Sequence, residues 1–258
     1  MRSMCAWFDT HIHLLAPEWD RPPQELCAEA HAAGVGALLM PGVRVADWSP
    51  LLCLARELSG VYFAPGLHPA YADQWSAEAE LQLKELAREA RVVAIGEIGL
   101  DAVAGPPLDV QEEVFRTQLE IALEADLPVL LHSRKTTGRV LAILRELNIG
   151  TLVGGVWHGF SGSVQVACEL VELGFKIGVG PILLRDSARK LPQAVLSVPA
   201  SALVLETDAP DMIGGPAGLL QVAEKLAELK GWDLAAVERL TAANAVSLLK
   251  ISLESSLS

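Results

Sequence analysis

The chain has 258 residues, of which 51% are hydrophobic and 20% are charged, and this composition is typical of one large globular domain or two small ones. Its formal net charge of −12 argues against a broad nucleic-acid-binding surface, because phosphate affinity normally comes from clustered lysine and arginine. That exclusion does not extend to a site that holds divalent cations, since bound cations reverse the local sign of charge whatever the net charge is.

Targeting segments and reactive cysteines are not indicated. No run of residues approaches the roughly 20 apolar residues that cross a bilayer. The N-terminal stretch MRSMCAWFDT leaves no room for the apolar region of a signal peptide, so we expect a cytoplasmic protein without a membrane anchor or an obligate protein partner. Four cysteines lie far apart without a CxxC pair, which predicts small core residues in a reducing compartment: Cys5, Cys27, Cys53 and Cys168.

Short apolar runs alternate along the chain with segments of helical periodicity. The runs predict eight strands, at residues 6–13, 36–41, 61–67, 92–98, 128–132, 151–158, 175–180 and 202–208. Segments such as 77–90 and 110–125 place apolar residues at spacings of three and four, which predicts amphipathic helices. Glycines are expected just past the ends of helices at Gly34, Gly60, Gly150 and Gly174.

The alternation of strands and helices predicts a parallel sheet. Eight strand-helix units in about 250 residues fit a closed (β/α)₈ barrel better than an open doubly wound sheet. The nearly all-apolar strands agree, since the strands of such a barrel are covered on both sides. No dinucleotide fingerprint follows the first strand, and no linker or internal repeat interrupts the chain. We therefore expect an α/β fold with a single (β/α)₈ TIM barrel as one domain, residues 1–258.

The first predicted strand carries two histidines, in the stretch FDTHIHL. Successive side chains of a strand point to opposite faces, so His11 and His13 are expected on the same face. Two adjacent imidazoles suit a metal ion, although further ligands must come from elsewhere in the chain. The alternative is an ordinary buried strand in which these histidines bond to the backbone.

Other ionisable residues lie at the ends of the later predicted strands. In a barrel of this kind, the functional residues occupy the C-terminal ends of the strands and the loops that follow. His31 lies instead in the helical run LCAEAHAAG, which predicts a structural or surface residue. The residues at the strand ends are His11, His13, His68 in GLHP, Glu97 in AIGEIGLD, His132 in PVLLHSR, His158 in VWHGFSG and Asp208 in LETDAP.

A group of imidazoles and carboxylates at one barrel mouth is unfavourable without partners, because each unpaired polar group costs roughly 1–3 kcal/mol. The number of candidate ligands exceeds the three or four that hold one catalytic zinc, so two neighbouring divalent ions that share a carboxylate explain the group better. A purely structural hydrogen-bonded cluster is the alternative. Ser133 and Ser161 lie beside candidate ligands, but no free histidine is left to act as their base, which disfavours a Ser-His-Asp mechanism.

The ordered motifs FDTHIHL, GLHP, GEIGLD, PVLLHSR, HGFSG, ETDAPDM and TAANAVSLL resemble the TatD-type metal-dependent deoxyribonucleases of the amidohydrolase-like barrel superfamily, from about residue 6 to residue 249. The resemblance implies a two-metal 3′-5′ exonuclease that cleaves single-stranded DNA or DNA 3′ ends with a metal-activated water. It implies two divalent ions, Zn, Mn, Ni or Mg, and Glu97 in place of the carboxylated lysine of other superfamily members favours the TatD branch.

The resemblance also implies a role for each matching residue. His11, His13 and Asp208 match the ligands of one ion, His132 and His158 match those of the second ion, and Glu97 matches the carboxylate that bridges them. Asp208 and Glu97 are the implied catalytic residues, and His68 and Arg134 match residues that face the substrate.

The chain departs from that family in two loops. After GEIGLD it continues AVAGPP, where such proteins usually carry aromatic or basic residues, and after ETDAPDM the run IGGPAGLLQV lacks an Asn-x-Pro element. Two alternatives therefore remain: a metal-dependent hydrolase of a small ester, amide, lactone or aminoacyl-tRNA ester, and a metal-binding barrel without catalysis. DNA binding is expected to depend mainly on the metals, Arg134 and a few cleft residues such as Arg185.

Overall fold

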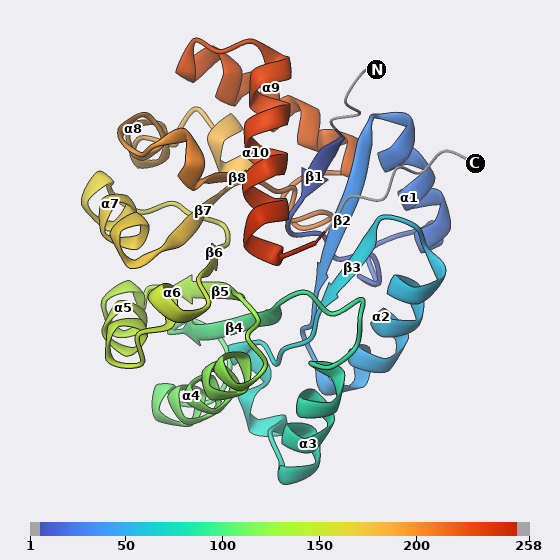
Figure 1. The fold of residues 1–258 in the computed structure, drawn as a ribbon, viewed down its shortest axis with the longest axis vertical. Helices are drawn as coiled ribbons and strands as arrows, with labels where there is room; N and C mark the ends of the chain where they lie inside the picture. The colour runs from blue at the N-terminus through green and yellow to red at the C-terminus, as the bar shows by residue number, and fades with distance from the viewer. Residues whose placement is uncertain (1–5, 252–258) are drawn as a thin grey trace.

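Eight parallel strands form the centre of the molecule in the computed structural model, which describes residues 6–251 (Figure 1). Each of the eight predicted strands is present, although most of them are shorter than predicted. Their bounds are β1 Trp7–Asp9, β2 Val35–Pro41, β3 Val61–Ala64, β4 Ile95–Asp101, β5 Val129–Arg134, β6 Gly155–Trp157, β7 Phe175–Val179 and β8 Leu203–Leu205.

The strands are arranged as two hydrogen-bonded arcs, one of β1 to β3 and one of β4 to β8. Individual backbone hydrogen bonds connect the arcs at both seams. At one seam the Thr10 N–H donates to the Leu205 carbonyl at 3.0 Å, and at the other the Val93 N–H donates to the Phe63 carbonyl at 3.1 Å. The chain thus has the ring of parallel strands predicted for a TIM-barrel fold.

Helices surround the strands (Figure 1). Their ends carry the expected signals: the Ser76 side chain accepts the Ala79 N–H at 3.1 Å at the start of α3, and Gly174 adopts φ 99° at the end of α7. The α-helices are α1 Pro23–Ala32, α2 Val45–Glu57, α3 Ala77–Leu86, α4 Leu108–Glu124, α5 Thr137–Glu146, α6 Ile149–Leu152, α7 Val164–Leu173, α8 Lys190–Ser197, α9 Leu219–Lys230 and α10 Leu234–Leu249. Short 3₁₀ segments are η1 Pro69–Gln74, η2 Pro181–Leu184, η3 Ala200–Ala202 and η4 Pro216–Gly218.

Two buried clusters divide the apolar side chains. The larger cluster lies between the strands and the surrounding helices. The smaller cluster contains Phe8, Leu130 and Val204 from the strands together with Ala245 of α10, which packs against β1 and β8. Because side chains alternate along a strand, His132 on β5, two positions after Leu130, continues on the same side, toward the C-terminal end of the ring. Asp208 lies beyond the end of β8 at Leu205 and has a φ of 49°, so the loop after β8, and not strand alternation, positions its side chain.

Two local predictions were wrong. Gly150 lies inside the short helix α6, where an added Cβ would overlap the Leu173 carbonyl, and this helix occupies the first residues of the predicted strand 151–158. Cys53 is exposed on α2, because the buried face of that helix is formed by other residues, whereas Cys27 is buried as predicted and Cys168 is half-buried. Cys5 lies outside the described residues. Within residues 6–251 no helix combines the length and hydropathy needed to cross a bilayer.

Candidate metal centre

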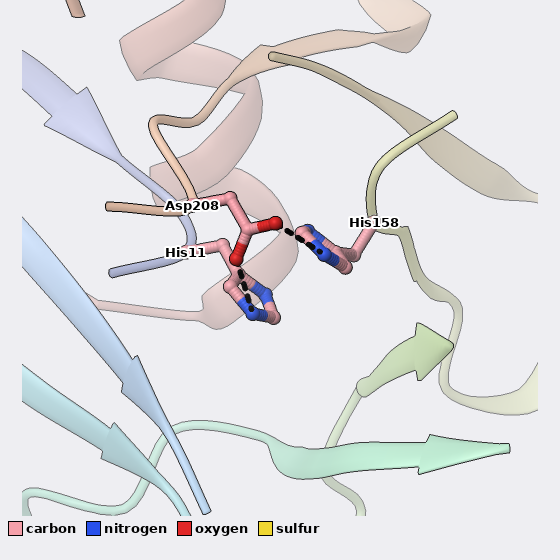
Figure 2. A group of neighbouring side chains, drawn as sticks. All are labelled: His11, His158 and Asp208. Atoms are coloured by element: carbon pink, nitrogen blue, oxygen red, sulfur yellow. Dashed lines mark ion pairs between the residues drawn. The ribbon is translucent and has the colours of Figure 1, made fainter. Parts of the chain in front are cut away.

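Asp208 lies between two imidazoles at the mouth of the barrel (Figure 2). Its Oδ1 atom is 3.8 Å from His11 Nε2, and its Oδ2 atom is 3.5 Å from His158 Nε2. The rings of His11 and His158 stack with centroids 3.5 Å apart. These residues follow β1, β6 and β8, so three distant parts of the sequence meet at this carboxylate.

His13 extends this group. Strand β1 ends at Asp9, but the chain stays extended enough that the Nε2 atoms of His11 and His13 lie 3.2 Å apart, on the same side as predicted. His13 Nε2 is 3.3 Å from Asp208 Oδ1, and His11 Nε2 is 3.4 Å from Glu97 Oε2. Glu97 therefore connects this group to the imidazoles on the other side of the mouth.

The second side of the mouth is built around Glu97 on β4. Its Oε1 atom lies 2.7 Å from His132 Nδ1, and it lies 3.9 Å both from His68 Nε2 and from His158 Nε2. Among residues 6–251, three trios have ligand atoms within 4.8 Å of one another: His11, His158 and Asp208; His11, His13 and Glu97; and His68, Glu97 and His132.

The chemistry of this donor set fits divalent cations. Imidazole nitrogens and carboxylate oxygens without a thiolate suit Zn, Mn, Ni and, with more oxygen ligands, Mg. Two imidazole nitrogens that face each other at 3.2 Å can share only one hydrogen, and the buried Nδ1 atom of His11 has no hydrogen-bond partner in the described structure. A cation between the nitrogens and the carboxylates would satisfy lone pairs that a hydrogen-bonded cluster leaves unused.

Both carboxylates are ionised at neutral pH. Burial alone would raise the pKa of Glu97, but the imidazoles of His11 and His132 outweigh burial and hold that pKa well below its usual range. Burial likewise opposes ionisation of Asp208, and the neighbouring imidazoles, above all that of His158, lower its pKa. The site therefore presents two anions to a bound cation.

The imidazoles divide into two classes. For His13, His132 and His158 burial disfavours the charged form, but the facing carboxylates outweigh it and raise the pKa of each ring. Burial dominates for the other two, so that the pKa of His11 is lowered and that of His68 falls to about 4. A metal that binds the first class must displace protons.

Buried carboxylates that were not predicted as site residues contact the segments that carry the candidate ligands. The Asp9 carboxylate accepts the N–H groups of His11 at 3.1 Å and Thr207 at 3.0 Å, and the Thr207 hydroxyl at 2.6 Å. It thereby connects the ligand segment after β1 to the one after β8. Asp101 Oδ2 lies 3.3 Å from His132 Nε2, while its Oδ1 atom accepts the Val103 N–H at 2.7 Å.

Glu206 contacts His158 on the side of the ring that faces away from Glu97 and Asp208. Its side chain is fully buried, its Oε1 atom accepts the Gly159 N–H at 2.7 Å, and the same atom lies 3.2 Å from His158 Nδ1. Gly178 makes room for it, since an added Cβ there would lie 2.3 Å from Glu206 Oε2. Such a carboxylate-histidine pair turns the opposite ring nitrogen, Nε2, toward the mouth.

A simple signal could have found these residues. Asp9, Asp101 and Glu206 are carboxylates in or next to strands that are otherwise apolar, where a charged group is rare unless it has a partner. Among the predicted residues, Arg134 is exposed at the end of β5 and its side chain makes no ion pair within the described structure. His31 is exposed on α1, as predicted.

Residues 8–250 match the model of a family described as TatD related DNase. The chain is 34% identical over 254 residues to the uncharacterized metal-dependent hydrolase YabD of Bacillus subtilis, covering 95% of this chain and 99% of YabD. It is 34% identical over 256 residues to the 3′-5′ ssDNA/RNA exonuclease TatD of Cronobacter sakazakii, covering 93% and 97% of the two chains. The crystal structure of YjjV, a TatD homologue from Escherichia coli, is similar with a TM-score of 0.90 at 34% identity, covering 96% of this chain and 100% of YjjV.

Proposed function

The chain belongs to the TatD-related DNase family, and we propose that it is a 3′-5′ exonuclease that hydrolyses phosphodiester bonds of single-stranded DNA. The chain is a metal-dependent hydrolase, which is the activity that the names of several relatives give. The observation that supports the exonuclease proposal is the convergence of imidazoles from four strand ends, those of β1, β3, β5 and β6, on two ionised carboxylates, Glu97 and Asp208.

We propose that the site holds two divalent ions that share Glu97. His11, His13 and Asp208 are assigned to one ion, and His132 and His158 to the other. His68 and His158 lie equally far from Glu97 Oε1, at 3.9 Å, so distance alone does not choose between them as ligands. The identity of the ions, Zn, Mn, Ni or Mg, would depend on their supply.

The hydrogen bonding of His68 supports a role toward the substrate. Its Nδ1 atom accepts the Ala70 N–H at 3.1 Å, and its pKa of about 4 keeps the ring neutral at neutral pH. The single ring hydrogen must therefore lie on Nε2, which faces Glu97 and the mouth. A protonated Nε2 cannot ligate a metal, but it can donate a hydrogen bond to a phosphate oxygen.

When bound, the two ions would lower the pKa of a water molecule and polarise the phosphoryl oxygen. Asp208 stays ionised, so a carboxylate oxygen of Asp208 is able to accept the proton of the attacking water and to pass it to the leaving oxygen. Arg134, exposed at the end of β5, is suited to bind a phosphate oxygen through its planar guanidinium. No covalent nucleophile is required.

The test is a metal-reconstituted assay with labelled single-stranded DNA beside a panel of carboxyl esters, lactones and aminoacyl-tRNA. The Asp208→Ala protein serves as the blank. Metal-dependent shortening of DNA from its 3′ end is the expected result. Hydrolysis of esters or lactones with DNA left intact would reject the nuclease and support the alternative substrates. A barrel without catalysis would hydrolyse none of them. The cytoplasmic location stays a prediction.

A further inference from the structure

A cavity of about 290 Å³ lies between the loop after β6 and the segment from η2 to α8. We call it the basic pocket; the polar residues that line it are Ser161, Arg185, Ser187, Arg189 and Lys190. In Figure 1 this segment follows β7 and leads into α8, on the same side of the ring as β8. Asp186, exposed in the same segment, is its one acidic residue.

The basic pocket is continuous with the loops that carry two candidate ligands. Ser161 is three residues after His158 in the chain. The Arg185 guanidinium donates from Nη2 to Met212 Sδ at 3.4 Å, and the Met212 N–H in turn donates to the Asp208 carbonyl at 3.0 Å. The pocket therefore borders the loop that begins at His158, and its Arg185 contacts the loop that begins at Asp208.

The three cations of the basic pocket have no counterion in the described structure, whereas several cations elsewhere are paired. Arg44 pairs with Asp47, and Arg116 pairs with both Glu112 and Glu146. By contrast, no residue in 6–251 forms an ion pair with any of the three exposed pocket cations, Arg185, Arg189 and Lys190. In a chain of net charge −12, three adjacent cations without counterions form a local positive field that attracts an anion.

The lining of the basic pocket selects the kind of anion. Guanidinium groups, an ammonium group and hydroxyls are the donors that phosphate oxygens accept, and guanidinium can bind two oxygens at once. No aromatic side chain lines the pocket, so it offers no surface on which a nucleobase could stack. The composition therefore suits a sugar-phosphate backbone and not a base.

The opposite side of the mouth has the opposite charge. A second cavity of about 260 Å³ opens beside His13 and is lined by Glu18, Asp47 and Asp211, while its arginine, Arg44, is already paired with Asp47. Phosphates would be repelled from this cavity. A polyanionic chain that reaches the metal centre would thus be directed toward the basic pocket.

We propose that the basic pocket binds a backbone phosphate adjacent to the scissile one, so that a nucleic acid strand leaves the metal centre between β6 and β8. The identity of the strand rests on the proposed exonuclease function; the phosphate site itself rests on the pocket. It makes a polyanion the substrate class of this site and counts against neutral esters and lactones.

The test is fluorescence anisotropy with a labelled phosphorothioate oligothymidylate, which resists hydrolysis, on the full-length metal-loaded protein over a range of salt concentrations. The variant is Arg189→Ser with Lys190→Ser. The matched control is Arg88→Ser with Arg239→Ser, which removes two exposed cations without ion pairs, one just past α3 and one on α10, and changes the net charge equally. Melting temperatures of both variants verify folding.

The pocket variant should bind about tenfold more weakly than the unaltered protein, with a salt slope that is shallower by about 0.7 for each lost phosphate contact. The control should bind within about twofold of the unaltered protein. Equal losses in both variants would show a general charge effect and overturn the proposal, as would unchanged binding in both.

A second arm identifies the source of the phosphate. Inorganic phosphate is used as a competitor against the labelled oligonucleotide, beside an unlabelled oligonucleotide at equal phosphate concentration. Much stronger competition by the oligonucleotide supports a backbone site, whereas equal competition overturns it in favour of a free-phosphate site. Because binding is measured without cleavage, pocket-dependent binding with no DNA hydrolysis would refute the exonuclease function and leave this inference standing.

Discussion

Glu206→Gln removes one charge behind a candidate ligand while keeping the shape of the side chain. The glutamine oxygen can still accept the Gly159 N–H, which Glu206 Oε1 accepts at 2.7 Å, and it still faces His158 Nδ1. The ion pair between the carboxylate and the imidazole becomes a neutral contact. We therefore expect weaker metal binding without loss of the fold.

The size of the effect follows from that exchange. A hydrogen bond to a charged group contributes about 1.5–3 kcal/mol, and a neutral bond about 0.5–1.5 kcal/mol. The difference of roughly 1–1.5 kcal/mol corresponds to about tenfold in metal affinity, at the lower end of the range of about 10–100-fold found for residues behind metal ligands. Removing the carboxylate should also lower the pKa of His158 in the metal-free protein, because burial then opposes its charge with less compensation.

The assay is competition for Zn between the protein and a metal-indicator dye, with an NMR titration of His158 as a second measurement. Glu172→Gln, at an exposed position of α7, is the matched control and should leave both measurements unchanged. If Glu206→Gln binds Zn within about twofold of the unaltered protein while His158→Ala binds it far more weakly, then Glu206 does not position His158 and the reasoning is wrong.

Further outcomes can be checked separately. Glu97→Ala and Asp208→Ala should abolish hydrolysis with the circular dichroism spectrum retained, whereas His31→Ala should change neither; an equal loss of activity in His31→Ala would refute the site. Elemental analysis after reloading should find about two divalent ions per chain, and no retained metal would contradict the centre. Metal affinity should rise with pH between about pH 6 and pH 8, because the imidazoles that face carboxylates hold their protons above the usual pKa, and a pH-independent dissociation constant would contradict this. Iodoacetamide should alkylate exposed Cys53 well before Cys27, whose pKa burial raises to about 11, as peptide mapping can show.

The candidate ligands could be predicted because two regular features of a parallel barrel constrain them. The parallel strands of a barrel bring their C-terminal ends to one mouth, so residues far apart in the sequence, such as His11 and His158, converge once the strands are identified. The alternation of side chains then places Leu130 inside the ring and His132 above it. Neither step requires knowledge of a loop conformation.

The supporting residues could not be assigned roles in this way. Glu206 faces His158 only because the backbone of β7 is bare at Gly178, and this depends on the register between β7 and β8. The role of His68 depends on a single backbone N–H, that of Ala70, at the start of η1. Such contacts arise from loop geometry and strand register, which a pattern of residue types does not determine.

The net charge illustrates the same limit. The composition argued against nucleic acid, yet charge acts through its arrangement over distances of about a Debye length, roughly 10 Å at moderate ionic strength. Many carboxylates of this chain are paired with a nearby cation, as Asp109 and Glu112 are with Arg139. Arg185, Arg189 and Lys190, by contrast, form no ion pair within the described residues and keep their positive charge uncompensated. A strand at the mouth would therefore meet a positive pocket on one side and an acidic cavity on the other. That asymmetry, and not the total of −12, determines whether a phosphate backbone can approach the metal centre.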